Sequence, residues 1–230
     1  MATSSLFLLL ADGRFPAGAH AHSGGLEAAV AAGRVTDLAT LEAFLAGRLA
    51  TAGLVGAAFA AAAHRAVTSA VPPYAGPRWR CSTRSWTPRT AAPALRTVSR
   101  RQGRALLRAG RSIWPEACFH DLPATPGGAH QPLVLGLLCA AAGLSRAETA
   151  TVATHGTVTG AASAAVRLLG LDPYRVQALL VGLADLCDGT AAEAARAADD
   201  PPERLPAAAA PLADIHAQAH ATWEVRLFAS

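Results

Sequence analysis

Apolar residues in this chain recur at helical spacing rather than at strand spacing. Leu38, Leu41, Leu45 and Leu49 are three or four positions apart, and no stretch alternates apolar with polar side chains. A period near 3.6 places such residues on one face of a helix. Hydrophobic residues make up 52% of the chain but aromatic residues only 5%, because much of the apolar content is alanine, the best helix former. The sequence therefore predicts an all-α fold, a single-domain bundle of about seven to nine helices over residues 1–230.

Local signals agree with this prediction. Ser145 and Glu148 have the spacing of a capping box, in which each side chain satisfies a backbone donor at a helix start. Asp172 before Pro173 is typical of an N-cap followed by a proline in the first turn. Cys139 and Cys187 lie in apolar helical stretches, and no cysteine pair has zinc-type or redox spacing. We therefore expect these two cysteines to be small core residues.

The charge and the apolar runs argue against two classes of partner, although an arginine-rich nucleic-acid binder, which would show steep salt dependence, stays a third hypothesis. The net charge of +4 arises between Pro72 and Arg89, where there are four arginines and no acid, and the rest of the chain has 16 basic and 16 acidic residues. The longest apolar runs, 54–63 and 133–144, are shorter than the roughly 20 residues that span a bilayer. The first residues lack the basic flank of a signal peptide. We therefore expect no nucleic acid partner, no membrane association and a cytoplasmic protein.

Residues 68–90 break the helical pattern with prolines, arginines and two tryptophans. All 20 basic residues of the chain are arginine, as expected of a GC-rich gene. If GC-favouring codons for Trp79 to Pro88 are read from the last base of the first codon, they encode an acidic, helix-forming stretch, Ala-Val-Leu-Asp-Ala-Glu-Leu-Asp-Ala. We therefore predict that residues 68–90 are irregular and poorly packed, and that residues 71–88 are read in a shifted frame. Resequencing the gene tests this hypothesis.

Histidine pairs raise one enzymatic alternative. His20 and His22 flank a single residue and could face a metal, and imidazole suits nickel or zinc. His216 and His220 are one helical turn apart, so a metal-dependent hydrolase could use both pairs with Asp185 or Asp188. Neither pair alone supplies the three or four protein ligands of a zinc site, and no HExxH motif is present. We therefore predict no catalytic site, with His20 and His22 as weak metal candidates.

Two helix faces suggest contact surfaces. Arg96, Arg100, Arg104 and Arg108 recur every four residues, and Arg111 extends the row, which is either a solvated face or a docking face for an acidic partner. Gly156 and Gly160 lie one turn apart on a long predicted helix. Small residues at this spacing permit close helix packing, first within the core and second against a partner.

The opening of the chain resembles the urease accessory protein family UreF. Leu8 to Asp12, Pro16 to His20 and Ser23 to Glu27 match a family pattern in which a Pro-x-Gly turn leads into a Ser-x-Gly-Leu-Glu helix start. The stretches from Pro93 to Arg104 and from Ala161 to Leu169 also fit. The ending, His220 followed by Arg226-Leu227-Phe228, completes a likeness that covers nearly the whole chain outside about 67–90.

The resemblance implies a non-catalytic, homodimeric, all-helical adaptor for urease maturation. It would bind a UreD/UreH-type accessory protein and a UreG-type GTPase, regulate the GTPase, and help load nickel into the urease apoprotein. Nickel and GTP would be handled by the partners, with no cofactor bound directly. We expect the partner surface to include the two ends of the chain and the glycine-containing helix face. The predicted interface residues are Pro16, Gly18, His20, His22, Ser23, Gly25, Glu27, Gly156, Gly160, Arg167, His220, Arg226, Leu227 and Phe228.

Overall fold

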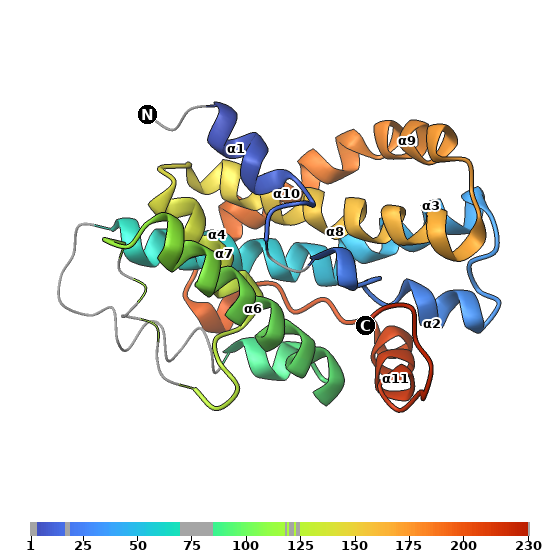
Figure 1. Cartoon of the computed structure of the whole chain (residues 1–230). Helices are drawn as coiled ribbons and strands as arrows, with labels where there is room; N and C mark the ends of the chain where they lie inside the picture. The colour runs from blue at the N-terminus through green and yellow to red at the C-terminus, as the bar shows by residue number, and fades with distance from the viewer. Residues whose placement is uncertain are drawn as a thin grey trace.

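The computed structural model describes residues 4–16, 19–69, 85–117, 119, 122 and 125–229. All regular structure within these residues is helical, so the prediction of an all-α fold is confirmed (Figure 1). The elements are α1 (Ser4–Ala11), η1 (Ala19–Ala21), α2 (Leu26–Ala31), α3 (Leu38–Arg48), η2 (Leu49–Gly53), α4 (Leu54–Thr68), α6 (Pro93–Ile113), α7 (Gln131–Ala141), α8 (Arg146–Leu169), α9 (Pro173–Gly182), α10 (Ala184–Ala197), η4 (Pro202–Arg204) and α11 (Pro211–His220).

Helix α4 forms the centre of the bundle. It packs against α7, α8 and α10, and Figure 1 shows it running through the middle of the molecule. Phe59 is fully buried, and most of its buried neighbours along α4 are alanines. Because alanine side chains are short, the surrounding helices approach the α4 backbone closely, and burial of their apolar side chains supplies the main driving force for folding. The alanine-rich composition therefore sets the spacing of the core.

The closest helix crossing depends on a single glycine of α7. A Cβ atom built on Gly136 would lie 2.7 Å from Ala63 Cβ and 2.8 Å from the backbone nitrogen of His64, and closer still to the carbonyl oxygen of Ala60. These atoms belong to the backbone or to the first side-chain carbon of α4, so they cannot rotate away. The contact between α4 and α7 therefore requires glycine at this position.

Helices α3 and α4 are continuous through η2, a π-helical turn. Gly53 and Gly56, which on sequence grounds would be expected to interrupt a helix, do not break it here. The continuous stretch Leu38–Thr68 is long and apolar enough to cross a membrane by length and composition alone, so the estimate that the apolar runs are too short also needs correction. In this fold, however, its C-terminal half is the core helix α4. The hydrophobicity is thus accounted for by burial inside the bundle.

The predicted helix starts and core cysteines are confirmed. The hydroxyl of Ser145 accepts from the Glu148 amide at 3.2 Å, and the Ser145 amide donates to the Glu148 carboxylate at 2.6 Å. The Asp172 carboxylate accepts from the Tyr174 amide at 2.9 Å. Cys139 and Cys187 are buried, and burial raises the pKa of the Cys139 thiol to about 12. Both cysteines therefore pack as apolar side chains.

Residues 85–89 contradict part of the prediction for residues 68–90. They form a helical turn, and α4 extends to Thr68. Trp86 is buried with its ring edge-on to Phe59 at 5.1 Å. The Arg89 guanidinium lies over the Phe59 ring and donates to the carbonyls of Ser85, Glu203, Leu205 and Pro206 at 2.8–3.0 Å. These contacts order the end of the segment. Residues 70–84, including Trp79, lie outside the described residues, so the frame hypothesis remains a prediction.

His130 connects the start of α7 to the rest of the core. It is fully buried, its Nδ1 lies 3.2 Å from the Ser99 hydroxyl, and its Nε2 has no hydrogen-bond partner. Burial, with the nearby charges of Arg100 and Arg96, lowers the pKa of His130 to about 4. The folded protein therefore holds this imidazole neutral under conditions in which the unfolded chain protonates it.

We expect His130 to make the fold sensitive to mild acid. Between the ordinary histidine pKa of 6.5 and the folded value of about 4, the unfolded state binds more protons, so stability falls as the pH falls. Lowering the pH from 7.5 to 5 should cost about 2 kcal/mol through His130. Urea unfolding at both pH values measures this, and His130→Asn should show a correspondingly smaller loss. The exposed His20, changed to Asn, is the control and should keep the full loss. An unchanged pH dependence in His130→Asn would contradict the assignment.

Candidate partner-binding surface

The turn before α2 is shaped by a buried serine and two glycines. The Ser23 hydroxyl, fully buried, accepts from the Glu27 amide at 3.2 Å. Gly24 and Gly25 have φ angles of +65° and +91°, which side chains other than glycine rarely adopt. Nη1 of Arg48 donates to the Gly24 carbonyl, and a Cβ atom on Gly24 would lie 2.9 Å from Nη2 of the same arginine. The Ser-Gly-Gly sequence therefore lets Arg48 pack against this turn.

Glu27 binds the other end of the chain. His220 Nε2 donates to Oε2 of Glu27 at 2.8 Å, while the amides of Leu227 and Phe228 donate to Oε1 and Oε2 at 2.7 and 3.0 Å. Burial raises the pKa of Glu27, but these donors outweigh burial and hold the pKa below its ordinary value. A buried carboxylate with three donors is fully satisfied. We call Glu27, His220 and the tail residues 227–229 the terminal clasp.

Further contacts fix the tail in the terminal clasp. The Ala229 amide donates to the Ala21 carbonyl at 2.7 Å, so the tail also touches η1. Phe228 is buried, and the Arg167 guanidinium of α8 lies 4.7 Å from its ring centroid. In Figure 1 the C-terminus accordingly lies beside α2 and α11. The clasp thus joins η1, α2, α8 and α11 at one surface.

The structure brings some of the predicted interface residues together in the terminal clasp and leaves others outside it. Ser23, Gly25, Glu27, Arg167, His220, Leu227 and Phe228 meet in or next to the terminal clasp. Arg226, Pro16 and His20 are exposed and make none of the clasp's hydrogen bonds, whereas His22 is half-buried. Gly18 lies outside the described residues. The two ends of the chain, predicted separately, therefore form one structure.

Gly156 and Gly160 do not pack in the way predicted for the core. A Cβ atom on either glycine would meet no atom within 4 Å, and Gly156 is exposed. The buried side of α8 is instead formed by residues such as Ala161 and Ala165. The expectation that these two glycines pack closely within the core is therefore wrong. Their contact with a partner remains a prediction.

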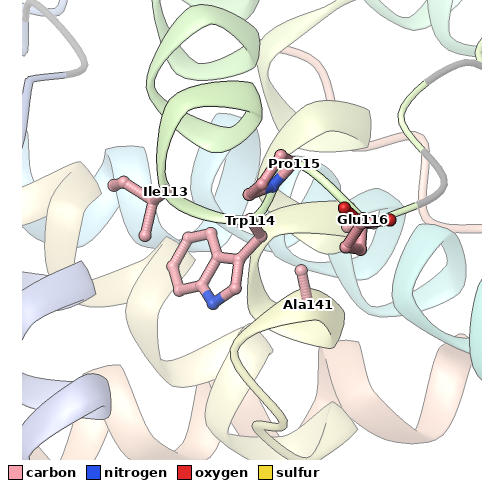
Figure 2. A pocket seen from close by; sticks show the side chains of 6 residues that line it. Ile113, Trp114, Pro115, Glu116 and Ala141 are labelled. Carbon is pink, nitrogen blue, oxygen red and sulfur yellow. The ribbon is translucent and has the colours of Figure 1, made fainter.

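A hollow in the described surface lies at the end of α6 and includes none of the predicted interface residues in its lining. It has a volume of about 450 Å³ and is lined by Ile113, Trp114, Pro115, Glu116, Ala117 and Ala141. Figure 2 shows the Trp114 ring and Ala141 of α7 facing this hollow. Glu116 is the one ionisable residue among the described residues that line it. Those lining residues include no nucleophile paired with a base, the usual basis of covalent catalysis.

Comparison with known proteins identifies the family. A sequence model of UreF matches residues 35–184. A protein named "Urease accessory protein UreF" from Mycobacterium sp. (strain JLS) is 44% identical over 230 residues, covering all of both chains. Its namesake from Mycobacterium marinum (strain ATCC BAA-535 / M) is 45% identical over the same length. The chain belongs to the UreF family.

This membership confirms the resemblance found in the opening and closing blocks of the sequence. A further UreF relative, from Mycobacterium tuberculosis (strain ATCC 25618 / H37Rv), is 42% identical over 223 residues, which is 96% of this chain and 95% of the relative. Because the alignments with the first two UreF relatives extend over the whole chain, they include both sides of the terminal clasp. The likeness to UreF is therefore not restricted to the helical core.

The hydrolase alternative is not supported for this UreF-family chain. Among the described residues, no group of three or more His, Cys, Asp or Glu side chains could hold a metal ion. His220 is bound to Glu27, and Asp185 and Asp188 are exposed on α10. The four histidines and two aspartates of that hypothesis thus do not form a site.

The sequence analysis missed Arg48, Ala21 and Ala229, which complete the turn and the clasp. Arg48 ends the apolar face of α3, so its position gave no sign of its contact with Gly24. Ala21 and Ala229 contribute only backbone atoms, and any residue except proline could supply the donor. The pairing of Glu27 with His220 joins residues 193 positions apart. No local spacing rule could have indicated it.

Proposed function

We propose that this protein is a non-catalytic adaptor in the nickel-loading complex that matures urease. The observation that carries the proposal is the identity of 44–45% over the whole chain with proteins named urease accessory protein UreF. The name of these relatives, accessory protein, supports a role without catalysis. We further propose that the protein acts in the cytoplasm, without nucleic acid or membrane.

The partners we propose are a UreD/UreH-type accessory protein, a UreG-type GTPase and the urease apoprotein. The surface around the terminal clasp is the proposed binding face, because Val225 and Leu227 expose 86% and 64% of their surface there. Apolar side chains exposed next to an ordered backbone are suited to burial against another protein. Nickel and GTP would be carried by the partners, with His20 and His22 as weak nickel candidates, and this chain would regulate the GTPase.

We also propose that the protein is a homodimer through the outer face of α8. Gly156 is exposed, and the space above Gly160 is open, so a helix of a second copy could approach the α8 backbone closely. Close approach increases van der Waals contact along the helices. Sedimentation equilibrium of the purified chain measures its mass, and a monomer at micromolar concentration would contradict the dimer.

The adaptor proposal predicts that a charge placed on the tail weakens partner binding. Leu227→Asp should reduce the affinity for the UreD-type protein at least tenfold, about 1.4 kcal/mol, because a buried aspartate would lack a counter-charge. Calorimetry with the co-expressed partners measures the affinity. Tyr174→Asp on α9, where the side chain is 84% exposed, is the matched control and should bind normally.

Two results would contradict the proposal. If the unmodified chain binds neither the UreD-type nor the UreG-type protein, alone or together, the adaptor function is wrong. If Leu227→Asp binds as well as Tyr174→Asp, the tail is not the binding face. The GTP hydrolysis rate of the UreG-type protein, measured with and without the chain, tests the regulatory role separately.

A further inference from the structure

A groove separates the first half of α6 from α11 and the tail. It has a volume of about 300 Å³, and its walls include Ala94, Val98 and Arg101 on one side and Ala217, Gln218 and Arg226 on the other. Ala94, Val98 and Arg101 are three or four positions apart and so share one face of α6. Helices α6 and α11 lie next to each other in Figure 1. We call this the basic groove.

The two arginines of the basic groove have no partner among the described residues. Three other arginines on and before α6 donate to carbonyl groups of the same chain: Arg96 binds Thr90 and Ala91, Arg104 binds Gly127, and Arg89 binds four carbonyls. Arg101 and Arg226 make no such bond in the described part of the chain, and both are exposed. Their guanidinium groups are therefore available to an external acceptor.

The surroundings reinforce the positive charge of the groove. No aspartate or glutamate is among its described lining residues. Of the acids on the neighbouring elements, Glu27 is held in the terminal clasp and Asp214 is partly buried near the Ala92 amide, whereas Glu224 is exposed on the tail. His22 is close enough to Arg101 that burial, the Arg101 charge and His20 together lower the pKa of His22. A carboxylate entering the groove would thus be attracted by two fixed charges.

The walls between the arginines favour a peptide segment over a small anion. Leu95, Val98, Ala217 and Ala221 present apolar side chains, and the Gln218 carbonyl is already used, accepting from the Ala94 amide at 3.1 Å. A hydrated anion such as phosphate would find donors in the arginines and the Gln218 amide group but would lose water against these apolar side chains. A segment with an acidic residue beside an aliphatic one would satisfy both the arginines and the apolar surface.

We propose that the basic groove binds an acidic, partly aliphatic segment of a partner protein, with Arg101 and Arg226 pairing its carboxylates. The groove borders the terminal clasp, since His220 and Ala229 belong to both. Occupation of the groove would thus extend the tail surface onto α6. This inference rests on the proposed adaptor function and adds the chemistry that the partner must carry.

The test compares two charge reversals on one helix. Arg101→Glu should weaken binding of the UreD-type or the UreG-type protein to the full chain at least tenfold, and Arg101→Lys should restore part of the affinity. Arg108→Glu is the matched control, because Arg108 is an exposed arginine two turns further along α6 and outside the groove. It should bind within about twofold of the unmodified chain. Circular dichroism confirms that each variant is folded.

The remaining outcomes separately test the groove proposal, the adaptor function and the class of ligand. If Arg101→Glu binds both partners normally, or if Arg108→Glu loses as much affinity, the groove proposal is overturned while the adaptor function stands. If the unmodified chain binds neither partner, the adaptor function fails and this inference fails with it. Equilibrium dialysis with inorganic phosphate separates the ligand classes. Phosphate binding that is lost in Arg101→Glu would mark a small-anion site and overturn the peptide assignment.

Discussion

Glu27→Ala should release the C-terminal tail and lower the free energy of unfolding by about 2–4 kcal/mol. The substitution removes the acceptor of three hydrogen bonds, from His220 and from the amides of Leu227 and Phe228. The substitution leaves the buried His220 without its hydrogen-bond partner. The amides of Leu227 and Phe228 can then bond to water only if the tail leaves the protein surface. Urea unfolding measures the loss of stability, and hydrogen exchange at Leu227 and Phe228 measures the release.

Glu224→Ala is the matched control for this experiment, because Glu224 is an exposed glutamate close to the tail and outside the clasp. It should change stability by less than about 0.5 kcal/mol. Glu27→Gln keeps one acceptor oxygen but turns its amide group toward a donor, so its loss should be intermediate. Slow exchange of the two tail amides in Glu27→Ala would show that other contacts, such as the one between Arg167 and Phe228, hold the tail without Glu27.

Gly136→Ala is expected to destabilise the protein by at least about 3 kcal/mol, although it adds only one methyl group. The new Cβ would overlap the Ala60 carbonyl and would lie 2.8 Å from the His64 amide nitrogen. Relief requires α7 to move away from α4, which loosens the centre of the core. The helix propensity of alanine, worth up to about 1 kcal/mol, cannot offset this.

Gly160→Ala adds the same methyl group but should have the opposite effect on the stability of the chain. Its Cβ would meet no atom within 4 Å, so the gain in helix propensity should stabilise the isolated chain by up to about 1 kcal/mol. Thermal unfolding of both variants at low protein concentration compares them without the effect of association. Equal effects of the two substitutions would contradict the packing described for α7.

The sequence indicated the helices well because their signals are local. The capping residues Ser145 and Asp172 act within three positions of themselves, and the leucines of α3 repeat within one helix. The glycines show the limit of such signals. Gly160 pairs with Gly156 at helical spacing and Gly136 is the one glycine of α7, yet it is Gly136 that faces the α4 backbone, while Gly160 faces open space. Tertiary packing, which spacing does not encode, separates their roles.

The candidate surface was predictable only in its parts. Family likeness pointed to Glu27, His220 and Phe228. Nothing in the sequence indicated that Glu27 accepts hydrogen bonds from His220 and from the amides of Leu227 and Phe228. Arg101 lies beside the predicted arginine row, in which Arg96 and Arg104 donate to carbonyl groups of the same chain. The free arginine became apparent only once the partners of its neighbours were known. The prediction that residues 68–90 are poorly packed was wrong at Trp86. The local sequence around Trp86 does not indicate that its ring packs against Phe59, which lies in another helix.

The terminal clasp also bears on how the chain is made. Glu27 emerges from the ribosome 200 residues before its donor Leu227 and 201 residues before Phe228. Until these donors emerge, the carboxylate must stay hydrated, because burying it without donors would be costly. A chain that changes reading frame before residue 220 never supplies them. The contacts of Glu27 therefore form late in synthesis, and the surface built on them distinguishes chains that carry residues 220–228 from chains that do not.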